Sequence, residues 1–115
     1  MSFKAISREV GDVSVIDMEG RITLGEGGDL LRDLIGERLG SGHKKIVMNL
    51  AGINYIDSTG LGELVAVYRQ MKGQGGELKL LNLNKKVSDL LQITKLYAVF
   101  DIHNDEARAI ASFHS

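Results

Sequence analysis

The sequence contains no cysteine, no proline and no tryptophan, and aromatic residues make up only 5% of its 115 positions. Without cysteine the chain cannot form a disulfide, a thiolate metal site or a cysteine nucleophile. Without proline, its turns must depend on the 14 glycines, which reach backbone conformations that other residues avoid. Neither charge sign dominates, since 14 Lys and Arg face 15 Asp and Glu, for a net charge of -1. A nucleic-acid-binding protein needs a concentrated positive face, so we expect no nucleic-acid partner.

Long apolar runs are also missing. The start of the chain, Met1-Ser2-Phe3-Lys4, lacks the apolar segment of a signal peptide, and no run approaches the roughly 20 apolar residues that cross a bilayer. We therefore expect a cytoplasmic protein with no membrane partner. The length fits a single domain, residues 1–115, and a hydrophobic content of 43% is enough for one core.

Periodic segments separated by short glycine-rich breaks predict the secondary structure. Two short runs on either side of Gly11-Asp12 predict an antiparallel pair of strands. Helices are predicted where apolar residues recur at helical spacing, at residues 30–39, 61–71, 87–94 and 106–113. Further strands are predicted at the short apolar runs 46–50, 78–83 and 99–102, with a loop at 51–57. The order β-β-α-β-α-β-α-β-α favours the α/β class, with a small mixed sheet and about four helices.

Residues 57–62, Asp-Ser-Thr-Gly-Leu-Gly, lie where an apolar strand leads into the second predicted helix. The first three all favour the N-cap position, so the helix begins here. Gly60 and Gly62 each cost up to about 1 kcal/mol in a helix relative to alanine. They indicate a surface without side chains that another backbone can approach. A phosphate on Ser58 would lie at the helix N-terminus, where free N–H groups and partial positive charge favour an anion.

Other interpretations of these residues stay open. Ser58 and Thr59 could simply cap the helix, which is a common role for such residues. A serine hydrolase would need a glycine two positions before Ser58, and the sequence has Ile56 there. The Gly25-x-Gly27-Gly28 pattern lacks the lysine and serine of a phosphate-binding loop, so it is interpreted as an ordinary loop. The three histidines are interpreted as solvated, with no metal-ligand spacing between them: His43, His103 and His114.

The segment Ile46–Gly62, which ends in the Asp-Ser-Thr-Gly-Leu-Gly hexamer, resembles the signature of bacterial anti-sigma-factor antagonists of the STAS family. The resemblance covers most of the chain, including three further stretches: Gly20-Arg21-Ile22, Gly75-Gly76-Glu77-Leu78 and Leu90–Leu96. It implies a STAS-like fold, a small mixed sheet with helices packed mainly on one side. It implies no enzymatic activity, no catalytic residue, no metal and no cofactor.

The resemblance also implies a partner-switching mechanism. The unphosphorylated antagonist binds an anti-sigma factor that is itself a serine kinase and so releases the sigma factor. Phosphorylation ends that binding, and a PP2C-type phosphatase resets the protein. The matching phosphoacceptor is Ser58, with Thr59 as a secondary candidate. The partner surface is then expected at eight residues: Asp57, Thr59, Gly60, Leu61, Gly62, Glu63, Gly25 and Glu26.

A second function remains possible from the sequence. STAS domains also serve as subunits that do not switch, in stress-signalling or lipid-transport complexes. In that case Ser58 would be a helix cap without a regulatory role.

Overall fold

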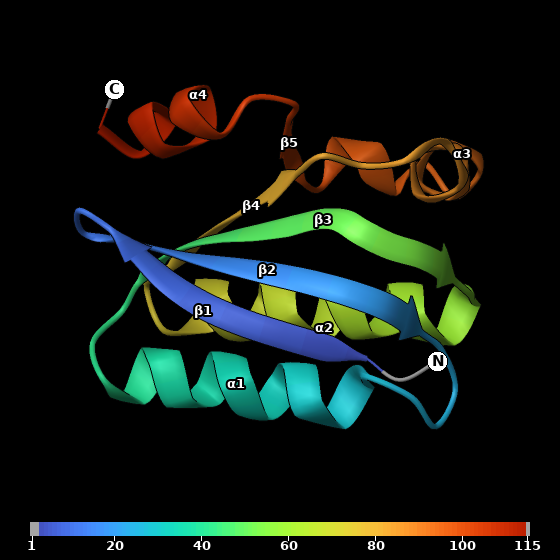
Figure 1. Cartoon of the computed structure of the whole chain (residues 1–115), viewed down its shortest axis with the longest axis horizontal. Helices are drawn as coiled ribbons and strands as arrows, with labels where there is room; N and C mark the ends of the chain where they lie inside the picture. The colour runs from blue at the N-terminus through green and yellow to red at the C-terminus, as the bar shows by residue number, and fades with distance from the viewer. Residues whose placement is uncertain (1–2, 115) are drawn as a thin grey trace.

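The computed structural model describes residues 3–114 and contains a five-stranded sheet with strand order β1-β2-β3-β4-β5 (Figure 1). The first two strands form an antiparallel hairpin around Gly11, which has a φ of 61°. The remaining pairs are parallel, so the sheet is mixed as predicted. The strands are β1 (Lys4–Val10), β2 (Val13–Ile22), β3 (Lys45–Ile56), β4 (Glu77–Leu81) and β5 (Asp101–His103).

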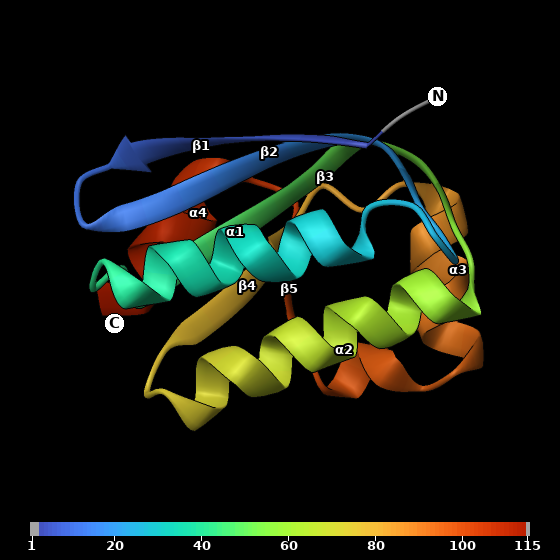
Figure 2. The ribbon, with the colours of Figure 1, turned by 90° about the horizontal axis from the view of Figure 1, so that it is seen from below.

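Most of the helical structure covers one face of the sheet. Figure 2 shows α1 and α2 side by side on this face, and α3 also packs into the core there. The shorter α4 lies against the opposite face. The helices are α1 (Gly28–Gly40), α2 (Ser58–Gly73), α3 (Lys85–Ile93) and α4 (Glu106–Ala111), with short 3-10 helices η1 (Leu96–Ala98) and η2 (Ser112–His114). The predicted class, element order and one-sided helix packing are confirmed.

Two cores hold these layers together. The larger lies between the sheet and helices α1 to α3, where Ile16, Met48 and Leu64 are fully buried. Burial of each such side chain contributes about 1.5–3 kcal/mol to the stability of the fold. The smaller core lies under α4 and consists of Val13, Val15, Val47, Leu81, Ala109 and Phe113. Neighbouring residues in a strand point to opposite faces of the sheet, so β2 and β3 contribute apolar side chains to both cores.

The predicted loop at 51–57 is wrong, because β3 continues to Ile56. Its second half pairs with β2, with Gly20 opposite Ile53 and Ile22 opposite Ile56. Gly52 interrupts the apolar run of the sequence, but the strand continues through it, because β2 lies too close to this position for a side chain. A Cβ at this position would lie only 2.6 Å from the carbonyl oxygen of Met18. The last strand is also displaced from its predicted range, 99–102, to Asp101–His103.

A charged cluster ties α4 to the sheet. The Arg8 guanidinium of β1 donates from Nε to Asp17 Oδ2 at 2.7 Å and from Nη1 to Glu106 Oε2 at 3.0 Å. Asn49 also donates to Asp17, at 2.8 Å. The hydrogen bonds from Arg8 hold the pKa of both carboxyl groups below their usual values. The cluster therefore links β1, β2 and α4 in a way that depends on ionised carboxylates.

We expect the Arg8→Ala variant to lose stability at neutral pH but not in acid. The two carboxylates have lower pKa values in the folded than in the unfolded state, so their contribution is complete at neutral pH and is lost as the pH falls below about 5. All three side chains are more than one-third exposed, which limits the loss to about 1 kcal/mol. Urea unfolding at pH 7, 4 and 3 measures this difference, with Arg69→Ala on the exposed face of α2 as the control. An equal loss at every pH would contradict the electrostatic explanation.

Candidate functional site

The candidate site lies where β2 and β3 end and α1 and α2 begin, at one end of the sheet (Figure 1). Because β2 and β3 are parallel, their carboxyl ends lie next to each other. In α/β proteins this edge is the usual position of functional sites, since the loops that follow the strands meet there. The predicted segment 57–62 and the loop before α1 are both at this edge, although Leu24 and Asp57 are 33 positions apart in the sequence.

Asp57 is the residue that caps α2. Its backbone is extended, and its Oδ1 accepts a hydrogen bond from the Gly60 N–H at 2.8 Å. Its Oδ2 accepts from the Leu24 N–H at 3.3 Å, which attaches the loop before α1 to the start of α2. These backbone hydrogen bonds lower the pKa of the Asp57 carboxyl group, and the bond from Gly60 has the largest effect. The interpretation of Ser58 and Thr59 as simple caps is therefore wrong, because their neighbour fills that role.

Ser58 is the first residue of α2 and is exposed. Within residues 3–114, nothing forms a hydrogen bond with its hydroxyl group. A phosphate here would lie at the positive end of a helix of 16 residues. The Asp57 carboxylate opposes part of this attraction by like-charge repulsion. Because Ser58 is exposed, a phosphate there would remain in solvent, and Thr59, the next residue, is exposed as well.

The two glycines of the segment have different roles. A Cβ on Gly60 would lie 1.9 Å from the carbonyl oxygen of Ile22, so Gly60 permits α2 to pack on the end of β2. The backbone that approaches Gly60 is the protein's own, which corrects the expectation that it leaves space for a partner. Leu61 is only 4% exposed and belongs to the core. Gly62 is exposed, and a methyl group added there would meet open space, so this residue leaves an open surface on α2.

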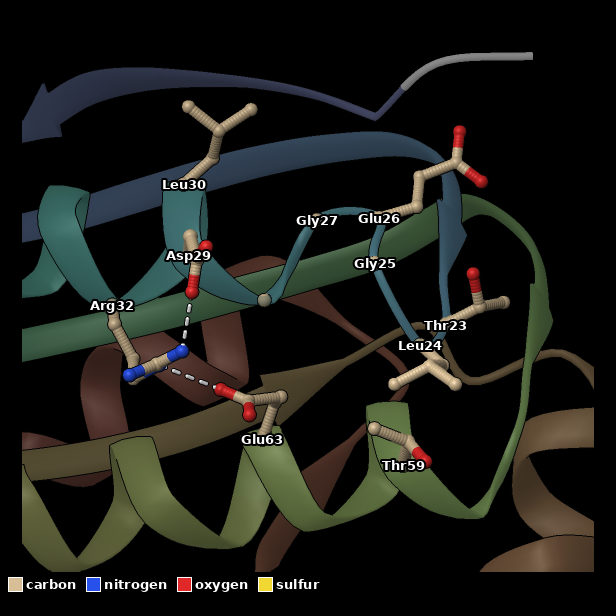
Figure 3. Close-up of a pocket in the computed structure, with 11 residues that line it drawn as sticks. Thr23, Leu24, Gly25, Glu26, Gly27, Asp29, Leu30, Arg32, Thr59 and Glu63 are labelled. Atoms are coloured by element: carbon tan, nitrogen blue, oxygen red, sulfur yellow. Dashed lines mark hydrogen bonds and ion pairs between the residues drawn. The ribbon is translucent and has the colours of Figure 1, made fainter.

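A hollow of about 430 Å³ lies between the loop before α1 and the first turns of α1 and α2 (Figure 3). The structure brings four of the predicted partner residues together in its lining: Gly25, Glu26, Thr59 and Glu63. Two backbone hydrogen bonds between Thr23 and Glu26, at 2.9 and 3.0 Å, hold the loop in place. The hollow therefore has a defined wall on its loop side.

An ion pair across the hollow connects the two helices. Arg32 of α1 forms an ion pair with Glu63 of α2, with 2.7 Å between Nε and Oε2, and also pairs with Asp29 (Figure 3). Glu63 was predicted as a contact residue, and the structure shows that it also links α2 to α1. Gly28 makes this possible, because a Cβ there would lie 2.8 Å from the Glu63 side chain.

Sequence reasoning missed three residues of this region. Arg32 gave no sequence signal for its ion pair. Leu24 is 78% exposed and Leu30 is 60% exposed, and both line the hollow. Leu30 was assigned to the apolar face of its helix, but α1 buries Leu31 and Ile35 instead, which places Leu30 beside that face. Exposed apolar side chains on two sides of a hollow are typical of an interaction surface.

The histidines lie outside this site. His43 Nε2 is 3.5 Å from Glu9 Oε1, and His103 Nε2 is 3.1 Å from Asp101 Oδ1. The interpretation of His103 as solvated is wrong, since its side chain is 19% exposed. The side chain of His114 lies outside the described residues. Among the residues that the structure describes, no three acidic or histidine side chains come together as a metal site would require.

The model of the STAS domain family matches residues 4–109, and the chain therefore belongs to this family. Over 53 residues it is 45% identical to the anti-sigma-B factor antagonist of Bacillus subtilis, a match covering 46% of this chain and 49% of that protein. The match thus spans about half the length of that relative.

Solved structures share the fold. An anti-sigma factor antagonist from Mycobacterium paratuberculosis has a TM-score of 0.86 and 19% sequence identity, covering 99% of this chain and 96% of that one. The Bacillus cell fate determinant SpoIIAA in its phosphorylated form has a TM-score of 0.73 and 20% identity, covering 96% and 99% of the two chains. In the described part of this chain, each helix is too short or too polar to cross a bilayer.

Proposed function

We propose that this protein is an anti-sigma-factor antagonist that is switched by phosphorylation of Ser58 and has no catalytic activity of its own. The observation that carries the proposal is the exposed, unengaged hydroxyl of Ser58 at the start of α2, beside a hollow with apolar edges. The similarity to the anti-sigma-B factor antagonist supports it, as does the phosphorylated form known for SpoIIAA. The partners would be an anti-sigma factor with serine kinase activity and a PP2C-type phosphatase, acting in the cytoplasm.

The proposed docking surface consists of Leu24, Leu30 and Thr59, which line the hollow, together with the exposed Gly62 of α2. Leu24 and Leu30 provide apolar area that would be buried against the partner. Gly62 lets the partner approach the α2 backbone closely. The Leu24 N–H donates a hydrogen bond to Asp57, the residue before Ser58. A group added to Ser58 would therefore lie at the edge of this surface.

A phosphate on Ser58 would then act at the interface and leave the fold intact. It brings about -1.5 to -2 charges, which would have to lose water against apolar side chains when the partner docks. The same charge is tolerated in the free protein, because it remains in solvent at a helix N-terminus. The switch therefore changes docking, with little change in folding stability.

Mapping the phosphate tests the proposal. The protein is incubated with the anti-sigma kinase of its own organism and ATP, and the modified residue is identified by mass spectrometry. We expect one phosphate, on Ser58, that is lost in Ser58→Ala and kept in Ser41→Ala, which removes an exposed serine at the end of α1. The Thr59→Val variant should still be modified. Full phosphorylation of Ser58→Ala would show that the switch lies elsewhere, and absence of any modification would favour the non-switching subunit.

The Gly62→Ala variant separates binding from folding. Alanine is favoured over glycine in a helix by about 1 kcal/mol, and the new methyl group meets open space, so stability should rise. The same methyl group keeps a partner from the α2 backbone. Binding should therefore weaken by about tenfold or less, because one extra methyl group at an interface has a small free-energy cost. Thermal unfolding and a partner titration measure the two effects. Unchanged binding would exclude Gly62 from the interface.

A further inference from the structure

A second hollow, of about 380 Å³, lies at the carboxyl ends of β4 and β5. It shares no lining residue with the hollow beside Ser58. One wall includes Ser88 of α3, and another includes Arg108 of α4. The end of β5 contributes Ile102 and His103 between them. The lining thus combines the Arg108 cation, the Asp105 carboxylate, neutral polar groups and apolar surface.

The topology explains why this hollow exists. Val87 and Leu91 pack α3 into the larger core on one face of the sheet, whereas Ala109 packs α4 into the smaller core on the other. The helices that follow the adjacent strands β4 and β5 therefore leave on opposite faces. In α/β proteins such a divergence opens a crevice outside the carboxyl ends of the strands, and ligands bind there. The helices after β2 and β3 both lie on the first face, so this divergence occurs at β4 and β5.

Arg108 carries the charge available for a ligand. It is exposed and forms no ion pair among the described residues. Asp105 also lines the hollow, and its carboxylate caps α4 by accepting from the N–H groups of Ala107 at 2.9 Å and Arg108 at 3.4 Å. The Asp101 carboxylate forms an ion pair with Lys79, which compensates its charge, and also lies 3.1 Å from His103 Nε2. The guanidinium of Arg108 is therefore left to bind an anion.

We propose that this hollow binds a small phosphate monoester. Arg108 would hold the phosphate, because a guanidinium matches its oxygens with two parallel hydrogen bonds. Ser88 and Asn104 supply neutral donors, and Leu83 and Ile102 face the organic part. The volume lies in the range of sites for small organic molecules, which favours an ester over free phosphate. This proposal does not depend on the role of Ser58.

Titration of the full-length protein with phenyl phosphate, followed by amide NMR, tests the site. We expect saturable shifts confined to residues around 83, 88 and 102–108. Arg108→Ala should weaken binding by about tenfold or more, since it removes a charge-assisted contact. The affinity of Arg108→Lys should lie between those of the unmodified protein and Arg108→Ala, because lysine keeps the charge but loses the paired guanidinium donors. The control is Lys86→Ala, which removes an exposed charge from α3 outside the hollow and should bind normally.

Two further probes define the ligand class. Inorganic phosphate should bind more weakly than phenyl phosphate, because it cannot use the apolar wall. Benzoate should also bind more weakly, because it carries one negative charge and fewer acceptor oxygens. Equal binding of either probe would overturn the assignment to a phosphate monoester. Equal losses in Arg108→Ala and Lys86→Ala, or shifts spread over all basic residues, would show unspecific attraction and exclude the site.

Discussion

Replacing Gly60 with alanine is expected to lower the free energy of unfolding by about 3 kcal/mol or more, the upper end for an inserted methyl group in a packed site. The new Cβ would overlap the Ile22 carbonyl oxygen, 1.9 Å away, and would also lie 2.9 Å from the Ile56 side chain. Backbone atoms cannot rotate away as a flexible side chain can. The start of α2 must therefore move off the end of β2, and the hydrogen bond between Asp57 and Gly60 is disturbed with it. Urea unfolding measures the loss.

Gly62→Ala is the matched control for this experiment. It makes the same chemical change two residues further along α2, where open space receives the methyl group. Helix propensity alone then predicts a gain of up to about 1 kcal/mol. Equal stabilities of the two variants would mean that Gly60 does not pack against β2 as described.

Replacing Ser58 with aspartate is expected to weaken partner binding by about tenfold to a hundredfold, because a charge that loses water against apolar side chains costs several kcal/mol at an interface. The melting temperature should change by no more than a few degrees, since position 58 is exposed and lies at a helix N-terminus. Isothermal titration and thermal unfolding of the same preparation give both values. Ser58→Ala should bind like the unmodified protein.

The control for the added charge is Ser41→Asp, in the turn after α1. It changes the net charge equally but lies away from the proposed docking surface. If Ser41→Asp weakened binding as much as Ser58→Asp, the effect would come from net charge and not from position 58. If Ser58→Asp bound normally, the docking surface would not include the start of α2.

Local sequence signals predicted the parts of the fold that depend on nearby residues. The element order followed from periodicity. The N-cap of α3 is also a local feature, since the Asn84 side chain accepts from the Val87 N–H at 2.9 Å. Features that depend on distant contacts did not follow. The second half of β3 was missed because Gly52 interrupts the apolar pattern, and only the pairing with β2 shows that this glycine admits a neighbouring strand.

In the candidate site too, features set by nearby residues were predicted and features set by distant contacts were not. The position of Ser58 at the start of α2 followed from the hexamer alone. The role of Gly60 was misjudged because a glycine that permits a close approach looks the same in sequence whether the approaching backbone is internal or foreign. The hollow could not be predicted, because it depends on how α1 packs beside α2 and on the ion pair between Arg32 and Glu63. Leu24 gave no periodic signal, since it lies in a glycine-rich loop.

The central claim is that one phosphate on the Ser58 hydroxyl decides docking and leaves the fold unchanged. Its most direct test is a titration of the anti-sigma partner with protein phosphorylated stoichiometrically at Ser58, beside unmodified protein, with amide NMR spectra of both free forms. We predict loss of binding in the phosphorylated form, with spectral changes restricted to the loop before α1 and the first turn of α2. Equal affinity of the two forms, or a spectrum of an unfolded chain after phosphorylation, would contradict the claim.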